Sequence, residues 1–153
     1  MSSPRARLGP YALLSGVYVL GLAGFVLAWR RSGRELPERI SLSDVALVGA
    51  ATYRTSRLIS KEKVATPIRA PFTEHEGKGG PAAVEESPRG SGLRYVIGEL
   101  LVCPFCLAQW IATAWLAALM AWPRPARFAA AVMSAVGLAD LLQFARCAGQ
   151  RRV

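Results

Sequence analysis

Two cysteines separated by two residues are the residues in this sequence whose type and spacing are best suited to chemistry. They form the motif Cys103-Pro104-Phe105-Cys106. Thiols at this spacing can close a tight disulfide or bind a soft metal ion together. Proline is favoured at the first position of a helix, so Cys103 is expected to face free N–H groups that stabilise a thiolate. We therefore expect Cys103 to be the attacking thiol and Cys106 the resolving thiol of any redox reaction here.

Three interpretations of this pair remain open from the sequence. The same four residues occur in thioredoxin-like enzymes, but there the motif follows a β-strand, and no strand pattern precedes it in this chain. Zinc needs about four ligands, so Cys147, His75 or the CxxC of a second copy would have to complete a zinc site at Cys103 and Cys106. The third interpretation is a proline-kinked helix with two small packed thiols, because free cysteine packs as a small hydrophobe.

A carboxylate and two arginines lie in apolar surroundings. Asp140 interrupts the last apolar segment, while Arg54 and Arg57 lie three residues apart on one face of an earlier helix. Charges at membrane depth are costly and face a partner or a cavity. We expect Asp140 to pair with Arg54 or Arg57, either for stability alone or as part of a functional site.

Glu99 precedes the first cysteine of the motif by four residues. If the helix continued through Pro104, then Glu99, Cys103, Cys106 and Trp110 would lie on one stripe of that helix. Glu99 could then accept a proton from a neighbouring thiol. The alternative is an exposed glutamate at the membrane interface.

A further arginine lies in the longest polar segment. Arg69 stands between Pro67 and Pro71, which predict a locally extended chain. We expect Arg69 either to bind a lipid phosphate or to dock the loop on the helices. The Glu-His-Glu run at 74–76 could touch a metal ion, but a single histidine in a polar loop is usually only solvated.

Apolar segments must position these residues. The residues 11–29 carry no charge, are bracketed by Tyr11 and Trp29, and at about 1.5 Å per residue cover a bilayer core of about 30 Å. The sequence predicts an all-α, polytopic membrane protein with three or four spanning helices; the further helices are expected near 41–60, 105–122 and 126–148. The helix near 41–60 is short of apolar residues, so it either spans with snorkelling arginines or lies partly in the interface. The segment 61–92 is rich in Gly and Pro and predicts a long irregular loop.

Loop charge predicts the orientation. In the four-span arrangement, one side carries 13 Lys and Arg residues and the other carries 6. Positive residues concentrate in the cytoplasm, so the long loop and the C-terminus are expected there. A three-span arrangement also places the long loop and the C-terminus on the cytoplasmic side. The lipid bilayer is then the first partner, and an unknown protein could bind the loop.

The composition of the chain argues against a nucleic-acid-binding protein. The chain is 52% hydrophobic with a mean hydropathy of +0.28, yet its net charge is +9. A basic chain can bind nucleic acid, but here apolar blocks separate the positive residues and no basic stripe alternates with aromatics. We expect no nucleic-acid partner, and we find no nucleotide-binding loop and no complete catalytic constellation.

Three stretches resemble a known bacterial membrane family. They are ATYRTSRLISKEKVATPIRAPFTEHEG (Ala51 to Gly77), GELLVCPFCLAQWIAT (Gly98 to Thr113) and GLADLLQFA (Gly137 to Ala145). Together they resemble domain of unknown function 1360, some members of which are labelled sporulation proteins, over roughly Leu42 to Ala145. The family pattern usually has Asp at the position of Glu62. The resemblance implies a membrane location and no activity.

The sequence thus predicts three regions: an additional N-terminal span with its connector (1–40), the family core (41–148) and a basic tail (149–153). The expected role is a non-enzymatic membrane or envelope factor without a resident cofactor. The alternatives are a membrane-embedded thiol oxidoreductase and a metal-binding protein, with zinc as its metal, both using the CPFC motif.

Overall fold

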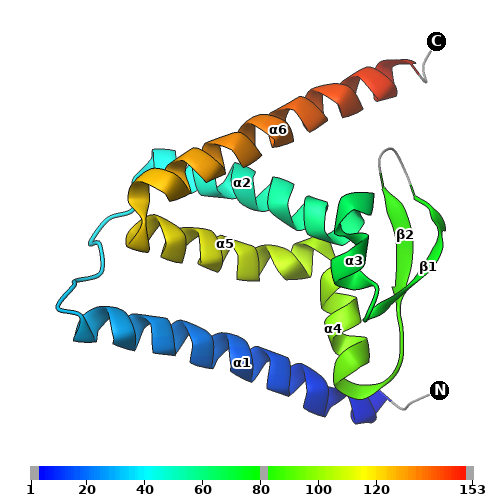
Figure 1. Ribbon diagram of the computed structural model, residues 1–153, viewed down its shortest axis with the longest axis horizontal. Coiled ribbons are helices and arrows are strands. Elements are labelled where there is room, and N and C mark those ends of the chain that lie inside the picture. The colour runs from blue at the N-terminus through cyan, green and yellow to red at the C-terminus, as the bar shows by residue number, and fades with distance from the viewer. Residues whose placement is uncertain (1–3, 80–82, 151–153) are drawn as a thin grey trace.

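The computed structural model describes residues 4–79 and 83–150 and shows a mainly helical chain (Figure 1). The helices that make up most of it are α1 (Pro4–Arg31), α2 (Leu42–Lys61), α4 (Gly92–Val102), α5 (Pro104–Ala121) and α6 (Pro123–Gln150). After α2 come a 3₁₀ turn, η1 (Lys63–Ala65), the short helix α3 (Thr66–Arg69) and an antiparallel hairpin of β1 (Thr73–Lys78) and β2 (Val84–Pro88). The all-α prediction holds for the bulk of the chain.

The centre of the molecule is α2, which packs against both α5 and α6 (Figure 1). The Ser41 hydroxyl accepts a hydrogen bond from the Asp44 N–H and caps the first turn of α2. Small residues bring the helices close: Ala51 on α2 and Ala130 on α6 are fully buried. A Cβ on Gly137 of α6 would lie 3.2 Å from the Cβ of Arg54, so glycine permits the close approach of α6 to α2.

Three helices are long and apolar enough to cross a membrane: Leu8–Arg31, Pro104–Ala121 and Pro123–Gln150. Their most apolar windows are almost entirely exposed in the isolated chain, at 0%, 6% and 11% buried. Apolar helices exposed to this extent need an apolar surrounding. By the same criteria of length and composition, α2 is not a candidate span. Its sequence therefore does not define whether it crosses the membrane.

The first helix lies beside the rest and contacts α4 and part of α5. The Tyr18 ring meets Trp110 edge-on with centroids 5.0 Å apart, and its hydroxyl lies 2.8 Å from the Thr113 hydroxyl oxygen. After α1, the connector (residues 32–41) returns the chain to α2 (Figure 1).

The polar segment after α2 is folded, contrary to the expectation of an irregular loop. We use "the lobe" for residues 62–79 and 83–91, which contain η1, α3 and the hairpin. The extended chain expected between Pro67 and Pro71 is also wrong, because Pro67 lies in the first turn of α3. Proline tolerates that place because its missing N–H would have no partner there.

The hairpin pairs Thr73 with Pro88 and Lys78 with Val84, with a register shift between His75 and Gly77. One side of β2 rests on α4. The contact runs from backbone to backbone at Gly98, where a Cβ would lie 2.5 Å from the Phe72 carbonyl oxygen. Only a glycine leaves room for α4 and the hairpin to meet in this way.

The helix does not continue through Pro104. Cys103 has extended backbone angles (φ −101, ψ 104), so α4 ends at Val102 and α5 begins at Pro104 in a different direction (Figure 1). The single stripe expected for Glu99, the two cysteines and Trp110 is therefore not formed, because Glu99 belongs to α4 and Trp110 to α5.

Candidate functional site

Polar and chemically reactive residues gather where the lobe meets the helices. Arg69 is at its centre and is fully buried, at 0% exposed. Its Nε and Nη2 donate to the two carboxylate oxygens of Glu86, both at 2.7 Å. Its Nη1 donates to the carbonyl oxygens of Ile59, at 2.5 Å, and Glu62, at 3.0 Å, while Nη2 also donates to the Thr66 hydroxyl at 3.3 Å.

These bonds use all five N–H groups of the guanidinium. No donor of Arg69 is left for a lipid phosphate, which was one of the two roles expected for it. The bonds to Ile59 and Glu62 instead satisfy carbonyls at the C-terminal end of α2, where a helix has unpaired acceptors. The arginine therefore fastens the lobe to α2.

Glu86 completes this buried pair from β2. Its side chain is 3% exposed, and it also accepts a hydrogen bond from the Thr73 hydroxyl at 2.8 Å. The hydrogen bonds from Arg69 lower the pKa of Glu86 below its usual value, against the opposing effect of burial and with help from Thr73. Glu86 therefore remains a carboxylate, and three parts of the lobe are joined through it: α3, β1 and β2.

A second ion cluster joins α2, the lobe and α6. The Arg54 guanidinium binds both carboxylate oxygens of Glu62, with Nη2 to Oε2 at 3.2 Å, and its Nε lies 3.4 Å from Asp140 Oδ2. Arg54 is nearly buried, at 9% exposed. The structure thus brings Asp140 to Arg54, one of the two arginines considered for it. The guanidinium of Arg57 lies over the Phe144 ring, 4.7 Å from its centroid.

The thiol pair occupies the junction of α4 and α5. Cys103 caps α5, because its sulfur accepts a hydrogen bond from the Cys106 N–H at 3.3 Å. Burial raises the pKa of the Cys103 thiol. Hydrogen bonds from Cys106 and from the Phe105 N–H, together with the charge of Lys61, lower this pKa by more than burial raises it. The pKa of Cys103 therefore lies below its ordinary value. Cys106 is exposed in the first turn of α5, and both thiols are free.

Glu99 contacts the first helix. Its carboxylate accepts a hydrogen bond from the Tyr11 hydroxyl of α1. This bond joins α4 to the first helix. Within residues 4–79 and 83–150, no group of three or more His, Cys, Asp or Glu side chains is placed to hold a metal ion. The zinc alternative therefore has only the two thiols as nearby ligands in the described part of the chain.

Sequence reasoning missed Glu86 and the role of Glu62. A buried arginine needs an acidic partner, and β2 starts with Val84 buried and Glu85 exposed. In the sequence this is one apolar residue followed by two glutamates, which is too short a pattern to indicate a strand beside the glycines that precede it.

The architecture defines a class: a helical protein with three apolar helices of membrane-spanning length and a polar lobe inserted before the thiol-bearing helix. The family model described as a protein of unknown function (DUF1360) matches residues 47–146, and the chain belongs to this family. The resemblance expected from the three stretches is thus confirmed.

One curated relative is the sporulation protein YjcA of Bacillus subtilis (strain 168). It is 28% identical over 102 residues, which cover 65% of this chain and 86% of the relative. No solved structure matches the chain.

Proposed function

We propose that this chain is a small multi-pass protein of a bacterial membrane with a non-enzymatic role, in which the lobe is a docking site for a protein partner. The observation that carries the proposal is the buried Arg69–Glu86 pair. A buried pair contributes little net stability compared with apolar packing, and its best-attested use is to specify one arrangement. Here it holds the lobe in one orientation at the end of α2, as a docking surface requires.

The charge of the lobe favours a protein over a lipid surface as its partner. Residues 62–91 contain five acidic residues and four Lys and Arg residues, so they carry a small negative charge in a chain whose net charge is +9. A segment that binds anionic headgroups is instead rich in Lys and Arg. Val64 on η1 and Ile68 on α3 are 73% and 61% exposed and offer apolar contacts. The sporulation label of the relative suggests the process in which such a partner acts.

Site-specific photocrosslinking in intact cells tests the docking proposal. A photoreactive side chain at Val64 or Ile68 should give one discrete crosslinked protein, whereas the same group at Leu138, an exposed apolar residue of α6, should not. Arg69→Ala should abolish the crosslink while the protein remains in the membrane. Crosslinking to lipid alone at both lobe positions would contradict the proposal.

A cytoplasmic location of the lobe is part of the proposal. It is supported by the Lys and Arg counts of 13 and 6 on the two sides of the four-span arrangement.

The thiol pair supports a second candidate function, thiol–disulfide exchange. The observation in its favour is the hydrogen bond from the Cys106 N–H to the Cys103 sulfur. The Cys103 thiolate would attack a disulfide of a substrate protein, forming a mixed disulfide and releasing one substrate thiolate. Cys106, after losing its proton, would then displace the second substrate thiolate, so two electrons pass to the substrate and Cys103 and Cys106 become a disulfide. A dithiol reductant would be needed to restore the pair.

A further inference from the structure

The side chains of Cys103 and Cys106 converge at the start of α5. The Cys106 N–H donates to the Cys103 sulfur at 3.3 Å, and the two thiols also lie within hydrogen-bonding reach of each other. Neither sulfur is part of a disulfide, and Cys106 is exposed. Two neighbouring thiolates are ligands that soft metal ions prefer, so the pair is a candidate metal site as well as a candidate redox pair.

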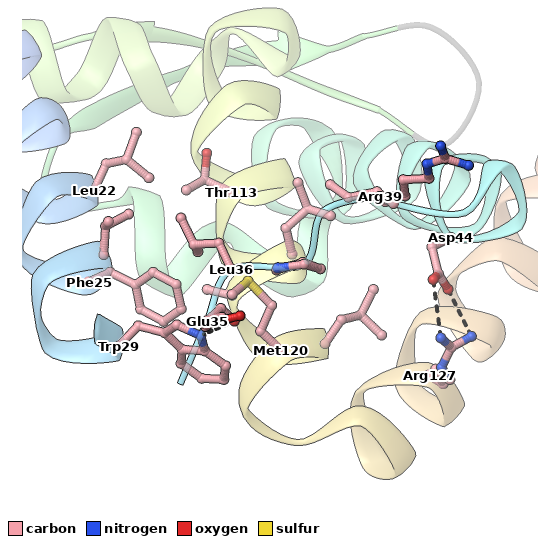
Figure 2. Close-up of a pocket in the computed structure, with 16 residues that line it drawn as sticks. Leu22, Phe25, Trp29, Glu35, Leu36, Arg39, Asp44, Thr113, Met120 and Arg127 are labelled. Atoms are coloured by element: carbon pink, nitrogen blue, oxygen red, sulfur yellow. Dashed lines mark hydrogen bonds and ion pairs between the residues drawn. The ribbon is translucent and has the colours of Figure 1, made fainter. Parts of the chain in front are cut away.

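The number of available ligands selects the metal. Zinc and iron–sulfur clusters require about four ligands, and in residues 4–79 and 83–150 no third His, Cys, Asp or Glu side chain completes a metal-binding group with the two thiols. The other sulfur atoms of this part of the chain lie elsewhere: Met120 lines an apolar groove at the opposite end of α5 (Figure 2), while Met133 and Cys147 belong to α6. Cu(I) is a soft ion that two thiolates alone can coordinate, so it is the metal that this ligand set fits.

The surroundings of the pair compensate the charge of such a complex. Cu(I) held by two thiolates carries a single negative charge. The first turn of α5 directs the N–H groups of Phe105 and Cys106 at the Cys103 sulfur, and the N-terminus of a helix favours negative charge. Lys61, in the last turn of α2, adds a positive charge that acts on the same sulfur. A negatively charged copper complex is therefore stabilised at this position.

We propose that Cys103 and Cys106 bind one Cu(I) ion per chain, with Lys61 as the compensating charge. Binding releases both thiol protons to solvent and forms two copper–sulfur bonds, and neither copper nor sulfur changes its oxidation state. Cys106 is exposed and Phe105 is 88% exposed, so the site is open to a thiolate of a partner protein that exchanges with one of the ligands. The proposal does not depend on the docking role of the lobe, and it uses the same sulfur atoms as thiol–disulfide exchange.

Anaerobic titration of the reduced protein in detergent with Cu(I) tests the site. In competition with bathocuproine disulfonate, the protein should retain one copper ion per chain, and X-ray absorption should show two sulfur neighbours. Cys106→Ser should abolish retention but keep the helix cap, because the cap uses the Cys106 N–H. Cys103→Ser should also abolish it, and serine is itself a favoured N-cap. Cys147→Ser, a change in the last turns of α6, should retain the copper.

Changes at Lys61 test the compensating charge separately from the ligands. Lys61→Gln should weaken Cu(I) binding about fivefold, because the positive charge that acts on Cys103 is lost. Lys61→Arg keeps that charge and should bind Cu(I) as the unchanged protein does. Equal affinities of the Gln and Arg variants would overturn the role of Lys61.

Protein purified anaerobically from copper-supplemented cells should also carry copper, and the Cys106→Ser variant should not. Copper that remains in both the Cys103→Ser and Cys106→Ser variants would overturn the proposal, as would one zinc ion held by two chains in preference to copper. A pair that forms a disulfide and never retains Cu(I) against the competitor would overturn it in favour of thiol–disulfide exchange. Crosslinking at Val64 and Ile68 tests the docking role of the lobe independently of all these results.

Discussion

At the scale of single residues, the Arg69–Glu86 pair is the contact on which the lobe depends most. Both side chains are buried, so removing one leaves the other as an uncompensated charge. We expect Arg69→Ala to destabilise the lobe by about 3–5 kcal/mol. Arg89→Ala is a matched control, because its pair with Glu74 is exposed and long, at 3.7 Å, and should change stability by at most about 0.5 kcal/mol. Hydrogen exchange of the hairpin amides in detergent micelles measures both effects.

Equal protection of the hairpin in the Arg69→Ala and Arg89→Ala variants would show that the buried pair does not hold the lobe. The double variant Arg69→Met, Glu86→Leu separates charge from packing. It should be more stable than either single change, since no unpaired charge remains.

The pH dependence of the lobe follows from Glu86. Its pKa is lowered in the folded chain, chiefly by the hydrogen bonds from Arg69. Its contribution to stability is therefore fully present above the pKa of the unfolded chain, about 4.3, and is lost as the pH falls through the folded pKa. Hydrogen-exchange protection of the hairpin should decline over this acidic window. Glu86→Gln should lower protection at neutral pH and flatten the acid-dependent decline, and a profile as steep as that of the unchanged protein would exclude Glu86 as the titrating group.

The two thiols should differ in reactivity. The Cys103 pKa is lowered in part by a hydrogen bond from the Cys106 side chain. In a chain lacking Cys147, the Cys106→Ser variant retains a hydroxyl donor and Cys106→Ala does not. We expect alkylation of Cys103 to show a midpoint below about 8.5 in the Ser variant and a higher midpoint in the Ala variant. Slow alkylation with a midpoint above about 9 in both would leave the pair as packing and remove the exchange mechanism.

At the scale of elements, the junction of α2 and α6 depends on a shared arginine. Arg54 binds Glu62 through two oxygens and Asp140 at 3.4 Å, so Arg54 retains a partner when Asp140 is lost. We expect Asp140→Asn to cost about 1–2 kcal/mol, less than the 3–5 kcal/mol of an isolated buried pair. Glu62→Gln should cost more, because it removes the closer, two-oxygen partner. Unfolding of both variants in detergent compares them, and a larger loss for Asp140→Asn would reverse the assignment of the main partner.

The helices could be predicted from the sequence because the patterns that indicate them are local. The uncharged run 11–29 lies within α1, and Pro104 marks the start of α5, as its preference for a first turn predicts. The ion pair of Asp140 with Arg54 was also among the predictions, since a charge in an apolar helix requires a partner.

The fold of the lobe could not be predicted from the sequence in the same way. The β1 run Thr73-Glu74-His75-Glu76-Gly77-Lys78 has no apolar alternation, and the hairpin is held by tertiary contacts to Arg69 and α4. Those partners lie outside the strands, so no local pattern indicates them. The metal alternative for the thiols and the absence of nucleic-acid binding stay predictions.

At the scale of the whole molecule, the testable property is orientation. We expect Glu85→Cys, exposed on β2, to be protected from an impermeant thiol reagent in intact cells of a variant without native cysteines. In the four-span arrangement, Glu38→Cys, exposed in the connector at the opposite end, should be labelled. The positive-inside bias is the physical reason for this expectation. Labelling of Glu85→Cys without permeabilisation would place the lobe outside the cell.

The backbone contact at Gly98 has a consequence for how the family can vary. An added methyl there would meet the Phe72 carbonyl oxygen at 2.5 Å, whereas at Gly16, Gly21 and Gly24 of α1 it would meet nothing within 4 Å. Overpacking of this kind costs about 1–3 kcal/mol, while alanine in an open helical position improves helix propensity. In a saturation mutagenesis library sorted for folded protein, position 98 should accept glycine alone and the three α1 positions should accept alanine freely. Frequent recovery of alanine at position 98 would mean that α4 and the hairpin can separate without loss of the fold.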